Sequence, residues 1–276
     1  MPPQEQPPAR DQPATRDQLP AQEQPPADDP PATRALLDRF LTALAPLGPV
    51  ALWAHGSLAG GDYQEGRSDL DLIAVLPRRP APRTLWRLAL LHARLGTAPL
   101  APLLHCTYLT PATATGTARR HLTWAHQELL RRPVTPVTRR ELHSFGRVLH
   151  GPPPADLLPP VTDPELTAFV VRDQRDFWRP KVDRAELWTR DVWVDHALIT
   201  LARATVTARD GRLISKREAL AVLPGLGAPA EVVEDIRARR YDGPRPAPAP
   251  DWTARRADLT RTYLGPAIDA LVASYS

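Results

Sequence analysis

Two short groups of residues have the types and spacing needed to hold a phosphate-bearing ligand and a divalent cation. Gly56-Ser57 follows a short apolar run, and Asp69 and Asp71 come after a spacer of eleven residues. Glycine lets a backbone approach a phosphate closely, while a serine hydroxyl and the N–H groups of a turn can donate to phosphate oxygens. Asp69 and Asp71 are two apart on an expected strand, so both carboxylates point to one face, where Mg²⁺ would relieve their repulsion. The spacing predicts a phosphate cradle beside a magnesium site.

The elements that must position these residues follow from the apolar pattern. It predicts strands over 50–55, 70–76 and 103–109, with helices over 33–46 and 84–95. From residue 119 onward the pattern is helical, over 119–131, 137–147, 164–178, 186–209, 215–223, 229–240 and 252–274. We therefore expect an α/β (α+β) domain with a mixed sheet over 32–115, followed by an all-α helical-bundle domain over 116–276.

The segment 1–31 differs from the rest of the chain. Ten of the 34 prolines lie in it, among glutamines and charged residues, with almost no large apolar side chains. Such a composition buries too little surface to offset its ordering entropy, so we expect a disordered tail. The functional alternative is a docking tail.

Composition restricts the class of protein. With 42% hydrophobic residues among 276, the chain can build a core, and no apolar run is long enough to span a membrane. The single cysteine, Cys106, excludes an intramolecular disulfide and a cysteine-based zinc cluster, and no signal peptide is evident. Lysine occurs only at positions 181 and 216, so the net charge of +4 reflects an arginine-rich composition. We expect a cytoplasmic monomer that binds neither membrane nor nucleic acid.

The Gly-Ser, spacer and Asp-x-Asp pattern resembles the nucleotidyltransferase superfamily. The resemblance implies that Asp69 and Asp71 are catalytic and bind Mg²⁺, and that Gly56, Ser57 and Ser68 contact the nucleotide. The third strand of this superfamily usually supplies a further carboxylate, and the best match here is His105. A neutral imidazole can take a proton from a hydroxyl nucleophile. The alternative is a packed histidine in a site of reduced or lost activity.

The helical part resembles the aminoglycoside (3'')(9) adenylyltransferases over 193–223, where Leu-Ile-Thr-Leu-Ala-Arg precedes Asp-Gly-Arg-Leu-Ile-Ser-Lys. That resemblance implies a cleft between the two domains for ATP and an antibiotic. It implies that Arg203, Lys216 and Tyr241 hold the nucleotide from the helical side. Trp124 matches a tryptophan that packs on the antibiotic, although a core tryptophan is the alternative reading.

Acids that bind cationic drug groups in this family have no direct match, because Trp193 stands at that position. Asp191 and Asp195 are the nearest candidates for binding the acceptor substrate. The expected activity is Mg²⁺-dependent transfer of AMP from ATP to a hydroxyl of a small polar molecule. One possible acceptor is an aminoglycoside, in which case the activity would confer antibiotic resistance. Two alternatives stay open, a catalytically impaired nucleotide-binding relative and a protein-AMPylating enzyme.

Overall fold

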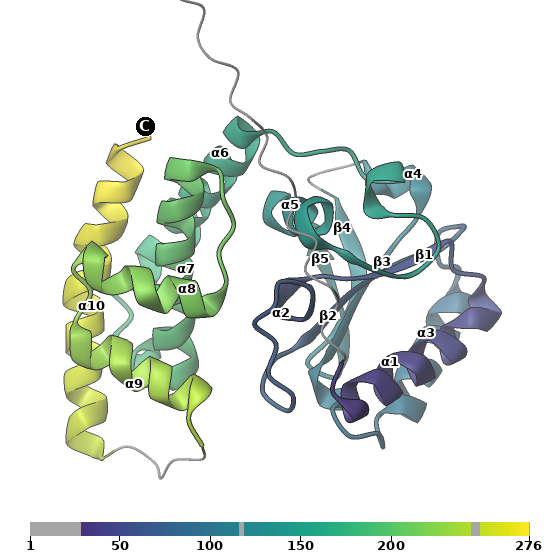
Figure 1. Ribbon diagram of the computed structural model, residues 1–276, viewed down its shortest axis with the longest axis horizontal. Coiled ribbons are helices and arrows are strands. Elements are labelled where there is room, and N and C mark those ends of the chain that lie inside the picture. Colours follow the sequence, from purple (N-terminus) through teal and green to yellow (C-terminus); the bar gives the residue numbers. More distant parts are fainter. Residues whose placement is uncertain (1–28, 116–118, 244–248, 276) are drawn as a thin grey trace, which may run out of the picture.

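The computed structural model describes residues 29–115, 119–243 and 249–275, which form a sheet half and a helical half side by side (Figure 1). The sheet half comprises the described residues up to 158, and its six strands lie in the order β5-β4-β3-β2-β1-β6. The β2 and β3 strands are parallel and the other neighbours antiparallel, so the sheet is mixed, as expected. The strands are β1 (Ala51–Ala54), β2 (Leu70–Val75), β3 (Leu104–Leu109), β4 (Arg120–Ala125), β5 (Glu128–Pro133) and β6 (Arg147–His150).

Helices cover both faces of this sheet. On one face α1 (Pro31–Leu44) and α3 (Pro82–Leu95) pack on Leu72 and Cys106. On the other face, Leu142 of α5 (Pro136–Phe145) packs against Trp53 and Ile73, and two four-residue helices, α2 (Gly56–Ala59) and α4 (Pro111–Ala114), follow strand ends. Because side chains alternate along a strand, Leu70 and Leu72 point toward α1 and α3. Asp71 between them therefore faces the side of α5.

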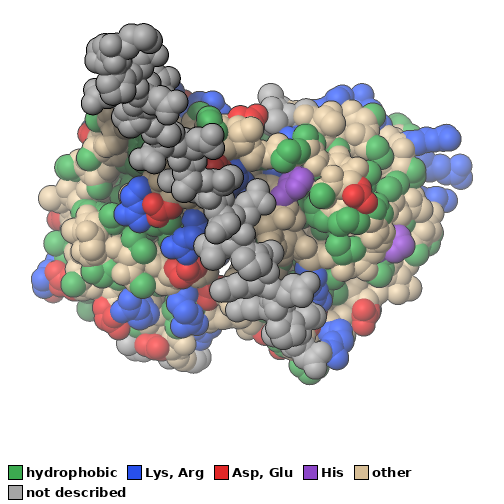
Figure 2. Space-filling view, turned by 45° about the horizontal axis from the view of Figure 1, so that its top comes forward, with side chains coloured by type: hydrophobic (Ala, Val, Ile, Leu, Met, Phe, Trp, Pro, Cys, Tyr) green, Lys and Arg blue, Asp and Glu red, His purple; other side chains and the backbone are tan. Residues whose placement is uncertain are grey.

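The helical half runs from α6 (Asp163–Asp173) through α7 (Asp191–Asp210), α8 (Lys216–Val222) and α9 (Ala230–Tyr241) to α10 (Pro250–Ala273). Capping boxes start α6 and α8, and Gly211 in the left-handed conformation ends α7. The surface of this half carries acidic and basic side chains close together (Figure 2). Across the described residues, no helix combines the length and apolar character of a membrane span.

One predicted element is wrong. Residues 119–131 do not form a helix, because β4 and β5 pair there as an antiparallel hairpin. The residues at its turn, His126 and Gln127, have φ of +54° and +65°. Asparagine or glycine usually occupies such a turn and signals it, and neither is present. Leu122 and Trp124 alternate with polar residues as a strand requires, but the alternation is too short to stand out.

The hairpin and β6 extend the sheet well beyond residue 115. The expected domain boundary after residue 115 therefore falls inside the sheet half, and we propose that the boundary lies between 158 and 163. At the other end, residues 1–28 of the predicted tail lie outside the described residues. Its last residue, Pro31, already belongs to α1, and Asp29 forms an ion pair with Arg147.

Candidate active site

The structure brings Asp69, Asp71 and His105 together at the β2–β3 pair. Parallel pairing places Asp71 opposite His105. The His105 Nδ1 atom lies 3.5 Å from an Asp71 carboxylate oxygen, and its Nε2 atom lies 3.9 Å from one of Asp69. The ring of His126, from the hairpin turn, meets the ring of His105 edge-on at 4.8 Å between centroids. Both carboxylates thus face one imidazole.

Asp71 is held as a carboxylate by its surroundings. Burial favours the neutral acid, but the hydrogen bond with His105 and the charges of His55, His105 and Lys216 outweigh it and lower the pKa of Asp71. Two carboxylates with several nearby positive groups form an oxygen donor set suited to a hard cation that also binds phosphates. In the described part of the chain, no group of three His, Cys, Asp or Glu side chains forms a complete metal cage. Mg²⁺ usually takes one or two carboxylates and completes its shell from phosphates and water.

Gly56 brings the first turn of α2 against these acids. Its φ is +62°, and a Cβ at this position would lie 2.7 Å from Oδ2 of Asp71. The His55 backbone N–H donates to the Asp71 carbonyl at 3.0 Å, which fixes the turn to β2. Ser57 follows as the second residue of α2. The Gly-Ser turn is therefore in direct contact with Asp71 of the acid pair.

Ser68 has a different environment from Ser57. Its side chain is buried, and its hydroxyl oxygen accepts a hydrogen bond from the Gln64 backbone N–H at 3.1 Å. Ser68 thus closes the turn that leads into β2 and positions Asp69 next to it. The hydrogen bond that the Ser68 hydroxyl makes in the structure is therefore one that stabilises this turn.

A chain of partly buried polar contacts connects the Gly-Ser turn to the helical half. Glu141 of α5 lies 3.1 Å from Nδ1 of His55 and accepts a hydrogen bond of 3.1 Å from Arg203 of α7. Burial opposes both charges, yet the mutual hydrogen bond raises the pKa of His55 and lowers that of Glu141. Arg203 also donates to the Ile214 carbonyl at 2.9 Å. His55 and Glu141 were not among the predicted site residues, and only the position of His55 next to Gly56-Ser57 could have indicated it.

Replacing Glu141 with glutamine is expected to lower the free energy of unfolding by about 2 kcal/mol at pH 5.5. Because the folded pKa of His55 is raised, its contribution is complete below the unfolded value of 6.5 and is lost as pH rises through the folded pKa. The contribution of Glu141 is present above its unfolded value of 4.5. Urea unfolding of the wild type and the variant across pH 5 to 9 should therefore show that the difference between their free energies of unfolding becomes smaller at high pH.

Glu234→Gln, which breaks an exposed ion pair with Arg237, is the matched control. It should change stability by less than about 0.5 kcal/mol at every pH. A Glu141→Gln effect that is constant with pH would show that His55 contributes nothing to the chain of contacts.

Tyr241 and Asp62 form a second contact between the halves. One Asp62 carboxylate oxygen accepts from the Tyr241 hydroxyl at 2.9 Å and from the Arg217 backbone N–H at 3.0 Å. The Arg217 guanidinium lies 4.0 Å from the centre of the Tyr241 ring. Burial and the bond to Asp62 raise the pKa of Tyr241 to about 12, so the phenol stays protonated. Arg67 completes the contact by donating to the Arg240 carbonyl at 2.9 Å.

Lys216 and His196 approach the acid pair from the helical half. The pKa of Lys216 is lowered by burial and by Arg240, while the charges of Asp71 and Asp69 act in the opposite direction. The pKa of His196 is lowered by burial and then by Lys216 and Arg240, against the charge of Asp69. Lys216 of α8 and His196 of α7 therefore lie close enough to interact with the charges of the aspartates. His196 and Arg240 belong to no motif, so sequence reasoning did not identify them.

Trp124 is not brought to the acid pair. It lies opposite Cys106 in the sheet, on the face covered by α1 and α3. Its ring stacks on His92 of α3, with 4.3 Å between centroids and planes 8° apart. The structure places it across the sheet from Asp71, in the environment of a core tryptophan.

Asp191 and Asp195 are engaged by arginines. Asp191 lies 2.6 Å from the fully buried Arg256 of α10, and Asp195 is ion-paired with Arg239 of α9. Burial raises the pKa of Asp195, while Arg239 acts against that rise. Neither acid is presented as a free carboxylate for a cationic ligand.

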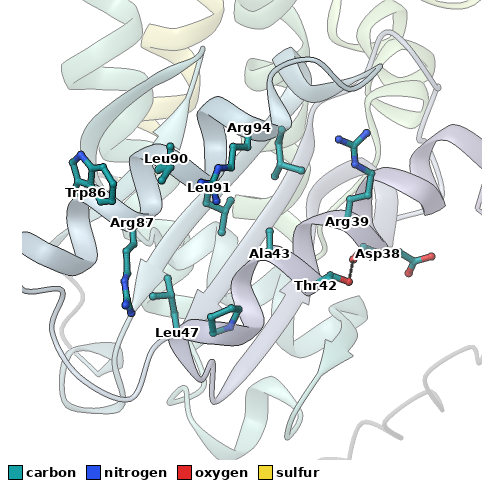
Figure 3. A pocket seen from close by; sticks show the side chains of 12 residues that line it. Asp38, Arg39, Thr42, Ala43, Leu47, Trp86, Arg87, Leu90, Leu91 and Arg94 are labelled. Carbon is teal, nitrogen blue, oxygen red and sulfur yellow. Dashed lines mark hydrogen bonds between the residues drawn. The ribbon is translucent and has the colours of Figure 1, made fainter.

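A groove of about 720 Å³ between α1 and α3 lies on the sheet face opposite Asp71 (Figure 3). Apolar side chains from both helices line its floor, Trp86 at its edge is 65% exposed, and Arg39, Arg87 and Arg94 border it. Across the sheet from the acid pair, this groove belongs to another surface and has no part in the candidate active site.

No protein-family model matches this sequence, and no curated protein matches it. The mixed six-stranded sheet followed by a helical part nevertheless confirms the predicted fold class, because a solved adenyltransferase structure has the same fold. The crystal structure of spectinomycin adenyltransferase AAD(9) from Enterococcus faecialis with ATP and spectinomycin is similar to this chain. Their TM-score is 0.64 at 15% sequence identity, over 86% of this chain and 98% of that chain. The similarity extends over both halves and confirms at the level of fold the resemblance inferred from the sequence.

Proposed function

We propose that this protein is a Mg²⁺-dependent nucleotidyltransferase that transfers AMP from ATP to a hydroxyl of a small polar molecule. The observation that carries the proposal is the convergence of Asp69, Asp71 and the Gly56-Ser57 turn. The fold it shares with an adenyltransferase crystallised with ATP supports the same reaction.

Asp69 and Asp71 are the residues that would hold Mg²⁺, which when bound neutralises charge on the phosphates. Ser57 and the backbone N–H groups of α2 would donate to phosphate oxygens, and Lys216 would supply a positive charge from the helical half. The acceptor oxygen forms a bond to the α-phosphorus, the bond to the oxygen bridging the α- and β-phosphorus atoms breaks, and pyrophosphate leaves.

His105 is the group that would receive the proton of the acceptor hydroxyl. Its imidazole faces both aspartates, and the Asp71 carboxylate would stabilise the imidazolium that forms. In the superfamily that the sequence resembles, the third strand usually supplies a carboxylate at this position. A neutral imidazole there can accept a proton in the same way. We therefore assign His105 the role of catalytic base.

The test of this function is incubation with ATP, Mg²⁺ and a panel of hydroxyl compounds that includes aminoglycosides and spectinomycin. The expected result is pyrophosphate release together with an acceptor that gains the mass of one AMP unit. ATP binding without transfer to any acceptor would identify a catalytically impaired relative. Labelled AMP found only on proteins of a lysate would identify protein AMPylation, and either result would overturn the proposal of a small-molecule acceptor.

Lys216→Met is expected to weaken MgATP binding about tenfold to a hundredfold, because one charge-assisted contact is worth about 1.5–3 kcal/mol. The other lysine of the chain, Lys181, offers a matched control. Its ammonium donates to the Phe177 carbonyl at 2.9 Å and lies 3.3 Å from the centre of the Phe177 ring. Calorimetric titration should show that Lys181→Met binds MgATP as the wild type does. Equal losses in the two variants would contradict the role of Lys216.

A further inference from the structure

The groove between α1 and α3 takes no part in the candidate active site and has a volume of about 720 Å³ (Figure 3). Leu47, Leu90 and Leu91 are among the apolar residues that line it, and Trp86 at its edge is 65% exposed. The other exposed large apolar residues in the described part of the chain are only 37–47% exposed. An aromatic ring exposed to this degree beside an apolar groove indicates a surface that another segment covers.

Positive charge surrounds this groove. Arg39, Arg87 and Arg94 border it, and Asp38 is the acidic residue among those that line it. Within the part of the chain that the structure describes, none of these three guanidinium groups forms an ion pair or a hydrogen bond. By contrast, Arg256 of the helical half is ion-paired with two aspartates. The groove therefore fits a partner that combines apolar with negatively charged groups.

The N-terminal segment of this same chain has the complementary composition. Residues 1–28 contain five acidic and two basic residues, so their net charge is −3, whereas the whole chain carries +4. Eight of the 28 residues are prolines, and proline-rich segments bind to grooves lined by aromatic side chains. Leu19 is the one large aliphatic residue among them, and it stands between the acids Asp17 and Glu23. Residues 17–23 thus combine the apolar and acidic groups that the groove fits.

The point where this segment joins the fold brings it close to the groove. The α1 helix begins at Pro31, and Arg39 at one end of the groove is eight residues further, about 12 Å along the helix. The groove continues roughly as far again, to Leu47 at the end where Arg87 lies (Figure 3). An extended segment of about eight residues covers both distances, and a reversal of direction takes about four more. Residues 17–23 can therefore reach the whole groove.

We propose that residues 17–23 bind in this groove of their own chain, antiparallel to α1. Leu19 packs on Trp86, and Asp17 pairs with Arg87 at the same end of the groove. Attachment to α1 gives the segment an effective concentration of about 1 mM. A local dissociation constant of about 0.1 mM is then enough to keep it bound for roughly nine-tenths of the time. The exposed ring and the unpaired arginines are thereby covered by one segment.

Backbone ¹⁵N relaxation of the full-length chain tests this proposal without any ligand. In the wild type, the non-proline residues of 17–23 are expected to have order parameters above about 0.7. Trp86→Gln should lower these values below about 0.6, the range of flexible backbone, because the apolar contact is lost. Since Trp86 is exposed, the signals of the sheet should show that the fold of the variant is intact.

Reversal of charge tests the ionic part of the contact. Arg87→Glu should release residues 17–23 as Trp86→Gln does, because it places two negative charges together, and adding Asp17→Arg to that variant should restore their order. Arg83→Glu is the matched control, since Arg83 is an exposed residue of the same helix that does not line the groove. It should leave the order parameters unchanged.

Three results would overturn binding of the tail within one chain. The first is an order parameter below about 0.6 across residues 17–23 of the wild type. The second is order that persists in Trp86→Gln, or that Arg83→Glu removes as fully as Arg87→Glu does. The third is order that disappears on dilution, which would assign the groove to the tail of a second copy. Because no ATP or acceptor is needed, each of these results is independent of the proposed function.

Discussion

Asp69→Asn is expected to reduce Mg²⁺-dependent pyrophosphate release from ATP about a thousandfold, which corresponds to roughly 4 kcal/mol of transition-state stabilisation. The substitution removes one of two negative charges that face His105 and are available to a cation. The side chain of Asp69 is 46% exposed, so its loss should leave the fold intact. Steady-state rates at saturating ATP, with the melting temperature as a check on folding, measure the effect.

Asp258→Asn is the matched control, because it makes the same chemical change at an exposed position of α10. Its rate should equal that of the wild type. A comparable loss of rate in the two variants, or full activity of Asp69→Asn, would contradict the assignment of Asp69 as a ligand of the metal ion.

Gly56→Ala is the second substitution with a large expected effect, of at least about a hundredfold on the rate. The new methyl group would lie 2.7 Å from Oδ2 of Asp71, so either the carboxylate or the Gly-Ser turn must move. The positive φ adds a destabilisation of about 1–2 kcal/mol for any residue with a Cβ. Both the rate and the free energy of unfolding should therefore fall, and both can be measured on one preparation.

Gly48→Ala separates the two causes, because Gly48 has a φ of +61° and nothing within 4 Å of an added Cβ. It should lose about 1–2 kcal/mol of stability while keeping its catalytic rate. If Gly56→Ala lost the same stability as Gly48→Ala and kept the same catalytic rate, the contact between the turn and Asp71 would not contribute to catalysis.

Much of the fold and the acid pair could be predicted from the sequence, for local reasons. The strands around Asp69 and Asp71 are short apolar runs, and most helices lie where regular apolar spacing predicts them. However, α6 ends at Asp173 and α7 begins at Asp191, not at residues 178 and 186. The parallel pairing of β2 with β3 then places His105 opposite Asp71. The expectation that His105 stands near these aspartates came from the superfamily resemblance, because no single residue indicates the pairing of the two strands.

The parts that could not be predicted depend on contacts between distant segments. The β4–β5 hairpin turns through His126 and Gln127 without a turn residue, and Trp124 alternates onto the face of α3 because of it. Asp191 and Asp195 resemble free acids in the sequence, while the arginines that pair with them lie on α9 and α10. Glu141 acquires its place only where α5 meets α7.

Binding of ATP at equilibrium, with and without Mg²⁺, tests the central claim most directly, since it requires no knowledge of the acceptor. Titration calorimetry of the wild type should show ATP binding that is at least about tenfold tighter with Mg²⁺. In the Asp69→Asn/Asp71→Asn double variant this dependence on Mg²⁺ should disappear. ATP binding with the same dependence on Mg²⁺ in both proteins would contradict the assignment of these two carboxylates as the cation site.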